Sequence, residues 1–414
     1  MKKIITIILL TVFSLLCFGC DINQTPKDTI EIEYDEIVYY TQTGSLKVKS
    51  YYENDEVTVK SLNSVVLSLE KINETEYLMT SHGIGDVKIL ITNKYGYRKE
   101  IKIQVKENDE FQAINGFNVT LDANEPYYMG KVYKLNIECL PNHYVNDQYT
   151  IIDNPDFILN KETMEIMFKH TGKTILSVYS EQKNIRVNQV FDIQINPDVE
   201  TYEILFVGNS LTYKHDIPAI IQNMITSDGA YCAYIQDTPG GSKLYEHELK
   251  FKANIEKYDF THIILQENSS GTINGYDLFE TAVKDYAKLL EDRDVQLILY
   301  QTWAYNVERW NGLTKYEMTQ RIVDAYDIVG KMVNAKITRS GEAFKAYELF
   351  DNTLPSLYDD MNHQSVYGAY LSACMHYSTL TKRPASSNAF RYEEIELEIQ
   401  ELIQRIADSI SFAE

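Results

Sequence analysis

This 414-residue sequence lacks two kinds of segment: clusters of basic side chains, and an apolar run long enough to span a membrane. Its formal net charge is −21, whereas nucleic acids and anionic lipid surfaces bind clustered Lys and Arg. We therefore expect no nucleic-acid partner. Tryptophan is scarce too, with two residues against 32 tyrosines. That balance fits polar-faced β-structure, although an A/T-rich genome gives the same bias.

The N-terminus reads Met-Lys-Lys, then an apolar run from Ile4 to Phe18, then Gly19-Cys20. A spanning helix needs about 20 apolar residues, so this pattern predicts a secretory signal. It resembles a bacterial lipoprotein signal, with Cys17 standing where Leu is usual. The resemblance implies a signal peptide at 1–20, lipidation of Cys20, a tether at 21–28 and attachment to the outer face of the cell membrane. An ordinary secretory peptide or an uncleaved anchor is the alternative.

Cysteine is scarce outside that signal. The three remaining residues, Cys139, Cys232 and Cys374, are scattered. They form neither a disulfide framework nor a metal-ligand spacing, so we predict buried thiols. We expect no metal and no cofactor.

The length allows two to four domains at about 100 to 200 residues each. Residues 29–107 show short alternating strands separated by Gly and Asn turns, which is typical of a small β-sandwich. The strand Gly85-Asp-Val-Lys-Ile-Leu-Ile and the closing Ile-Lys-Ile-Gln-Val resemble bacterial Ig-like domains. Residues 108–198 repeat the arrangement more loosely, with Gly172-Lys-Thr-Ile-Leu-Ser-Val in the equivalent late position. We predict two Ig-like domains that act as spacers.

From residue 199 onward, strands alternate with amphipathic helices, which indicates a parallel sheet covered on both faces. The expected strands are 202–207, 231–235, 261–265, 295–300 and 335–338. The expected helices open at Asp216-Ile-Pro218, with Asp216 as N-cap, and then cover 277–291, 314–332, 365–380 and 392–410. Ligands of such sheets bind beyond the carboxyl ends of the strands. Ser210 lies there.

Ser210 ends the stretch Ile204-Leu-Phe-Val-Gly-Asn-Ser, and a serine held at the mouth of a sheet is suited to nucleophilic attack when an imidazole can take its proton. Small polar residues also follow many strands as simple turn formers. Near the other end of the domain, Asp360 and His363 are three residues apart, immediately before a helix that Ser365 is placed to cap. This spacing lets the carboxylate reach one imidazole nitrogen and leaves the other free for the serine.

Together these residues resemble the SGNH (GDSL-like) hydrolase superfamily over roughly residues 202–384. The resemblance implies a flavodoxin-like three-layer fold at 199–414, with Ser210 as nucleophile, His363 as base and Asp360 as its partner. It also implies an oxyanion hole made by the backbone N–H groups of Ser210 and Gly241. The usual third block, Gly-x-Asn-Asp, is replaced by Leu265-Gln-Glu-Asn-Ser, so either Gln266 or Asn268 supplies the side-chain donor.

Two further residues are candidates for substrate binding. Trp303 is either a sugar-stacking or acyl wall or a core aromatic, and His247 either lines the site or ends a helix. We expect His215 at the surface and His262 and His376 in the core. The predicted protein is a monomeric surface esterase without cofactors, acting on an acylated carbohydrate or another small ester. The alternative is a non-catalytic adhesion protein with a degenerate hydrolase domain.

Overall fold

The computed structural model describes residues 30–108, 116–140, 149–181 and 184–413. The predicted signal peptide, the lipidation site Cys20 and the tether lie outside the described residues. The chain divides into two compact units. The first holds residues up to 118 together with 138–149 and 180–185, and the second holds 119–137, 150–179 and 186–414. Of the helices in the described ranges, none has the length and apolarity that crossing a membrane requires.

The first unit contains two four-stranded sheets that enclose one apolar core. Alternation of polar and apolar residues buries one face of each strand, as in β3, where every second residue from Gly44 to Val48 is buried. One sheet has the order β1 (Ile30–Tyr34), β3 (Thr43–Ser50), β6 (Glu76–Ser81) and β5 (Leu67–Lys71). The other has the order β2 (Ile37–Tyr39), β8 (Arg98–Lys106), β7 (Gly85–Asn93) and β4 (Val57–Ser61). The strand β2 was not predicted from the sequence.

Two more four-stranded sheets follow. Their orders are β13-β14-β11-β9 and β10-β16-β15-β12. The strands are β9 (Gly116–Leu121), β10 (Tyr127–Tyr128), β11 (Val132–Leu140), β12 (Thr150–Ile151), β13 (Phe157–Asn160), β14 (Glu165–Phe168), β15 (Gly172–Ser180) and β16 (Ile185–Gln194). Four aromatic rings, Tyr127, Tyr133, Phe168 and Phe191, pack between them with centroids 5.6 to 6.2 Å apart. The assignment of both β-segments to the Ig-like family stays a prediction.

A polar junction joins this β-structure to the α/β part of the second unit. His170 Nδ1 lies 2.7 Å from Glu203 Oε1, and both side chains are buried. Asp156 accepts hydrogen bonds from Lys257 Nζ at 2.8 Å and from the Tyr258 hydroxyl at 2.9 Å. Burial raises the pKa of Glu203, and the hydrogen bond with His170 opposes that shift. Both predicted segments, 108–198 and 199–414, thus contribute to the same compact unit.

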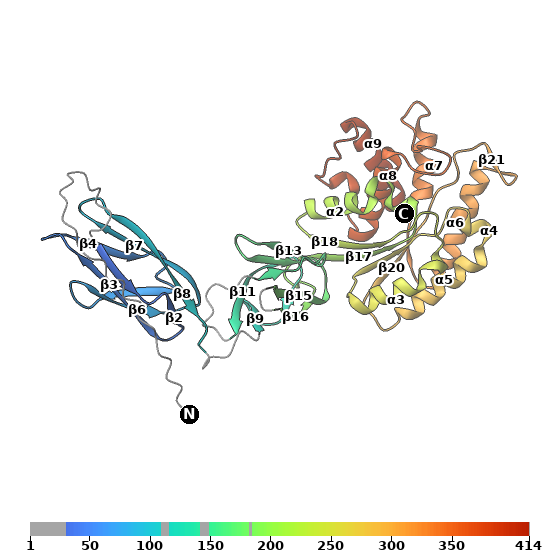
Figure 1. The fold of residues 1–414 in the computed structure, drawn as a ribbon. Coiled ribbons are helices and arrows are strands. Elements are labelled where there is room, and N and C mark those ends of the chain that lie inside the picture. Colours follow the sequence, from blue (N-terminus) through green and yellow to red (C-terminus); the bar gives the residue numbers. More distant parts are fainter. Residues whose placement is uncertain (1–29, 109–115, 141–148, 182–183, 414) are drawn as a thin grey trace. The chain divides into compact units, whose positions relative to one another are not determined.

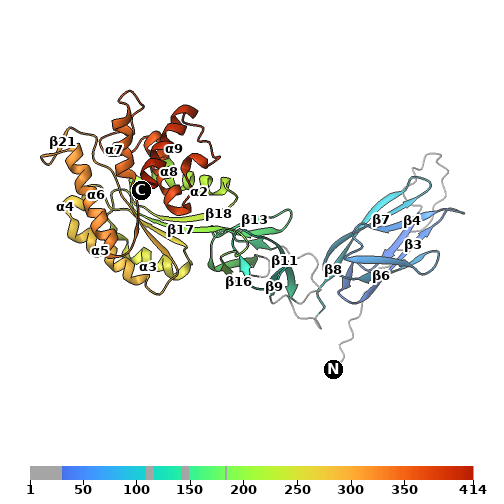
Figure 2. The ribbon, with the colours of Figure 1, turned by 180° about the vertical axis from the view of Figure 1, so that it is seen from behind.

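The α/β part is built on a five-stranded parallel sheet (Figures 1 and 2). Its order is β18 (Tyr231–Asp237), β17 (Thr201–Val207), β19 (His262–Leu265), β20 (Gln296–Tyr300) and β23 (Lys336–Thr338). This is the doubly wound order 2-1-3-4-5, whose connections reverse direction between its first and third strands, β17 and β19. Ligand sites of such sheets form at that reversal, beyond the carboxyl ends of the strands.

Helices cover both faces of this sheet, as the sequence predicts (Figure 1). On one face lie α2 (Ile217–Ser227), α7 (Ser340–Phe350), α8 (Val366–Thr381) and α9 (Leu397–Ser411). On the other lie α3 (Glu248–Lys257), α5 (Tyr276–Leu289) and α6 (Lys315–Met332). The inner strand β17 serves both cores, because Ile204 and Phe206 pack on the first face and Leu205 and Val207 on the second.

Several predicted boundaries change. Asp216 precedes α2, but its side chain makes no capping hydrogen bond because its backbone is left-handed, with φ 47°. The last helix begins at Leu397 rather than 392. Helices α3 and α7 were not predicted. Cys232 and Cys374 are buried as expected, whereas Cys139 is only half-buried.

Candidate active site

The loop after β17 presents Ser210 at the start of the short helix α1 (Ser210–Tyr213). Asn209 caps this helix, because its Oδ1 accepts a hydrogen bond from Leu211 N at 3.1 Å. Gly208 has no room for a side chain, since a Cβ there would lie 2.4 Å from Gln266 Oε1. The sequence Gly-Asn-Ser therefore matches a tight, buried turn, and the serine hydroxyl emerges at its exposed end.

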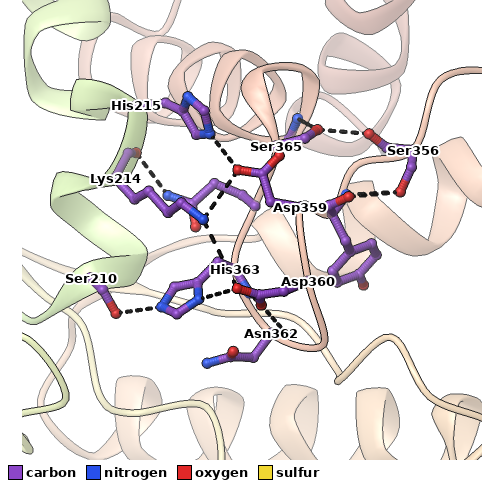
Figure 3. Close-up of polar contacts among 12 residues, drawn as sticks. Ser210, Lys214, His215, Ser356, Asp359, Asp360, Asn362, His363 and Ser365 are labelled. Carbon is purple, nitrogen blue, oxygen red and sulfur yellow. Dashed lines mark hydrogen bonds and ion pairs between the residues drawn. The ribbon is translucent and has the colours of Figure 1, made fainter.

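His363 lies between Ser210 and Asp360 (Figure 3). Its Nε2 is 2.9 Å from Ser210 Oγ, and its Nδ1 is 2.8 Å from Asp360 Oδ2. The side chain of His363 is 27% exposed, so the pair is open to a substrate. A carboxylate on one imidazole nitrogen fixes the tautomer that leaves the other nitrogen as a base for the hydroxyl. The structure thus brings together the three residues predicted as nucleophile, base and partner.

Asp360 is held by the turn that carries His363. Its Oδ1 accepts hydrogen bonds from the backbone N–H groups of His363 at 2.8 Å and Asn362 at 2.9 Å. The His363 backbone N–H is the largest cause of a pKa of Asp360 well below its usual value, and the Asn362 N–H and the imidazole add to it. The carboxylate is therefore ionised at neutral pH and can stabilise a charged imidazole.

A second set of polar contacts ties this turn to Lys214 and His215, which directly follow α1. Asp359 Oδ2 lies 2.8 Å from His215 Nε2 and 3.1 Å from Lys214 Nζ, as Figure 3 shows. Burial opposes ionisation of Asp359, but the hydrogen bonds from His215 and Lys214 outweigh it and lower its pKa. His215 has φ 56°, a conformation that costs a non-glycine residue energy unless its surroundings hold it. The sequence analysis placed His215 at the surface and missed its contact with Asp359.

Ser210 and His363 open into a pocket of about 330 Å³. The other lining residues are largely small or polar: Asn209, Leu211, Tyr213, Gly240, Gly241, Asn268, Ser269 and Asn362. Gly241 has φ +74°, a backbone conformation that favours glycine. Among the hydrogen bonds of the described residues, none uses the Gly241 N–H or the Asn268 side-chain N–H. Both donors are thus available at the pocket that holds the serine.

Gln266 does not lie at this pocket, which corrects its prediction as a possible oxyanion donor. The side chain is fully buried, and Oε1 accepts hydrogen bonds from Asn209 N and Thr212 Oγ1, both at 2.9 Å. Its Nε2 donates to Asn209 Oδ1 at 3.0 Å and to Glu267 O at 2.8 Å. Because both amide hydrogens are used, Gln266 holds the nucleophile loop in place and Asn268 is the remaining candidate.

Trp303 and His247 do not contact the pocket either, and both predicted substrate-binding roles are corrected. Trp303 is 1% exposed and stacks on Phe344 at 4.1 Å, while its Nε1 donates to Asn362 O at 2.9 Å. Through this hydrogen bond, Trp303 supports the turn that carries His363. His247 is 3% exposed, with Nδ1 2.7 Å from Asp237 Oδ2.

Two other histidines are packed away from the pocket. His376 is fully buried and contacts Thr338 Oγ1 at 3.1 Å, and burial lowers its pKa to about 3. Burial lowers the pKa of His262 to about 4, and its ring stacks on Tyr202. Both therefore stay neutral at physiological pH. Within the described ranges, no three His, Cys, Asp or Glu side chains form a group suited to holding a metal ion.

Glu267 is a buried carboxyl group beside the predicted oxyanion donor. It is 2% exposed and accepts hydrogen bonds from the backbone N–H groups of Asn268 at 2.7 Å and Leu244 at 3.1 Å. Burial raises its pKa to about 7, against the effect of these two hydrogen bonds. Such a shift beside a pocket is a frequent property of functional sites.

No protein-family model matches the chain, and no curated protein matches it. Solved structures do. A DUF4886 family protein from Bacteroides uniformis is 20% identical, covers 51% of this chain and 96% of its own, and has a TM-score of 0.43. A protein from Slackia heliotrinireducens assigned as an SGNH hydrolase is 21% identical, with 44% and 100% coverage and a TM-score of 0.38.

An acetyl xylan esterase from Geobacillus stearothermophilus, as a single-residue variant, is 12% identical, with 44% and 95% coverage and a TM-score of 0.36. The structural neighbours include SGNH hydrolases and GDSL-like proteins. They cover about half of this chain.

Proposed function

We propose that the protein is a serine esterase that hydrolyses short acyl esters by a Ser-His-Asp mechanism. The observation that carries this proposal is the position of His363, within hydrogen-bond distance of both Ser210 Oγ and Asp360 Oδ2. This arrangement, in which a histidine is hydrogen-bonded to both a serine and a carboxylate, recurs in serine hydrolases of unrelated folds.

In the proposed reaction, Ser210 Oγ attacks the ester carbonyl carbon while His363 Nε2 takes the hydroxyl proton. The carbonyl oxygen becomes an oxyanion, which the N–H groups of Ser210, Gly241 and the Asn268 side chain stabilise. The C–O bond to the alcohol then breaks, and His363 returns the proton to the leaving oxygen. Water repeats the sequence on the acyl-serine, which releases the acid and restores the serine. Asp360 stabilises the imidazolium in both halves.

We propose an O-acetyl group on a carbohydrate as the substrate. Support comes from the pocket, which is small and lined mostly by polar or small residues such as Gly240 and Asn362. Such a lining suits a sugar's hydroxyl groups better than a long acyl chain, which would need apolar walls. From the sequence we further propose a lipid anchor at Cys20, a position outside the cell and two Ig-like spacers. The non-catalytic alternative has less support, because Asn268 of the altered third block lines the pocket that holds Ser210.

The test compares the full chain with its Ser210→Ala and His363→Ala variants on p-nitrophenyl acetate, p-nitrophenyl octanoate and acetylated xylan. We expect acetate release by the wild-type protein, preference for acetyl over octanoyl, and a fall of about 10⁴-fold or more in each variant. Hydrolysis that survives Ser210→Ala, or its absence on every acyl ester, would reject the proposal. Binding of acetylated xylan without turnover would favour the adhesion alternative instead.

A further inference from the structure

Next to Gly240 and Gly241, the side chains of Asp237, His247 and Ser242 repeat the order of a catalytic triad. Asp237 Oδ2 lies 2.7 Å from His247 Nδ1, and His247 Nε2 lies 2.9 Å from Ser242 Oγ. Asp237 and His247 are 3% exposed each. None of the three lines the pocket of Ser210. Because the Ser242 hydroxyl contacts the carbonyl oxygens of Gly208 and Pro239 and does not line that pocket, we do not assign it as a second nucleophile.

Ser242 instead connects the loop of Gly241 to the loop of the nucleophile. Its hydroxyl donates to Gly208 O at 2.8 Å, and its carbonyl oxygen accepts from Asn209 Nδ2 at 2.9 Å. Ser242 therefore contacts the two residues that precede Ser210, while its neighbour Gly241 lines the pocket. Gly208 N also donates to Asp237 O at 3.0 Å. The backbone N–H and the carbonyl oxygen of Gly208 are thus both bound to residues of the segment from Asp237 to Ser242.

The Ser242 hydroxyl lies within hydrogen-bond distance of three groups. The Ser242 hydroxyl has one hydrogen, and Gly208 O and Pro239 O, both 2.8 Å away, can only accept it. When that hydrogen goes to a carbonyl, His247 Nε2 must donate to Ser242 Oγ. His247 Nδ1 faces one carboxylate oxygen of Asp237, and the second oxygen of Asp237 contacts Lys250 Nζ at 3.1 Å.

We infer that Asp237, His247 and Ser242 are positioning residues that fix the Gly241 N–H relative to Ser210, so that the oxyanion donor is in place before the substrate binds. The inference rests on the proposed esterase function. An oxyanion donor acts mainly on the transition state, where charge appears on the oxygen. A misplaced donor should therefore lower kcat and leave KM nearly unchanged.

The test uses Ser242→Ala, which removes the hydroxyl, and two replacements of His247. His247→Gln keeps a donor within reach of Ser242, whereas His247→Leu keeps none. Thr338→Val is the control, because it removes a hydroxyl that, like the Ser242 hydroxyl, contacts a buried histidine, here His376 outside the pocket. For each protein, kcat is measured on p-nitrophenyl acetate per site titrated with a phosphonate. The affinity for a small alkylboronic acid, which forms a tetrahedral adduct on serine, is measured in parallel, together with Tm.

For Ser242→Ala and His247→Leu we expect kcat to fall by about 10- to 100-fold, boronate affinity to weaken by a similar factor, and KM to change by less than about threefold. His247→Gln should recover part of the loss, and Thr338→Val should lower Tm alone. Unchanged kcat and boronate affinity in Ser242→Ala and His247→Leu, with a lower Tm, would reduce the network to a structural role and overturn the inference. A wild-type protein without Ser210-dependent hydrolysis would reject the proposed function, and the inference with it.

Discussion

The buried carboxyl group of Glu267 should make the stability of the α/β part depend on pH. Its folded-state pKa of about 7 lies above the ordinary value of 4.5 because burial disfavours the charged form. A raised carboxyl pKa means that the folded protein binds a proton more tightly than the unfolded chain. The stabilising effect of that proton is fully present below about pH 4.5 and is lost as the pH rises to about 7 and above.

Glu267→Gln removes this titration. Each pH unit between the two pKa values corresponds to about 1.4 kcal/mol, so the stability of the variant relative to wild type should rise by about 3 kcal/mol from pH 4 to pH 8. The amide also loses an acceptor for Leu244 N or Asn268 N, which adds a cost that is constant with pH and leaves the slope unchanged.

Urea unfolding followed by tryptophan fluorescence is a suitable assay, because both tryptophans of the chain, Trp303 and Trp310, belong to the α/β part. The measured quantity is the difference in unfolding free energy between variant and wild type, at half-unit pH steps. Other titrating groups are common to both proteins and cancel in the difference. A difference that stays flat across this range would refute the reasoning and would mean that Glu267 ionises normally.

The other predictions concern residues around the serine. Asn268→Ala should lower kcat by about 10²-fold with little change in KM. Gln266→Ala should mainly lower the urea midpoint, because it breaks a buried network in which each lost hydrogen bond costs about 1 kcal/mol or more. Asp359→Ala removes the partly exposed contacts of this carboxylate with Lys214 and His215, worth at most about 1 kcal/mol, so steady-state kinetics should show at most about a fivefold loss of kcat. Trp303→Phe should reduce the Tm and keep the KM, because the indole supports the histidine turn and does not face the pocket; a raised KM would contradict this placement.

The sequence was sufficient to predict the parallel sheet and to pair Ser210 with Asp360 and His363. Both features depend on local signals: a buried strand that runs into a small-residue turn, and an Asp-x-x-His spacing before a capped helix. The choice between Gln266 and Asn268 was not accessible in this way. Gln266 continues the hydrogen-bond ladder of β19, with its N–H on Val207 O, and its side chain is turned into the interior. Only the three-dimensional arrangement shows which amide reaches the pocket.

The prediction that Trp303 binds substrate failed for a related reason. Trp303 is covered by Phe344 of α7, a helix that was not predicted because it opens with Ser340-Gly341 and has no clear N-terminal signal. The role of His247 was hidden for another reason. Its partners, Asp237 and Ser242, precede it by ten and five residues, and that spacing matches neither a helical face nor a strand face.

The junction around Glu203 bears on how separable the parts of the chain are. Glu203 lies within β17, the strand that leads to Ser210, and its buried carboxyl group meets its imidazole partner, His170, only in the preceding β-structure. A shorter protein that began at residue 199 would lose His170 and leave that carboxyl group without its partner in an inner strand of the sheet. The β-structure before the α/β part thus supplies a buried partner to β17. A chimera that transfers the α/β part to another protein would therefore have to include the residues from 119 onward.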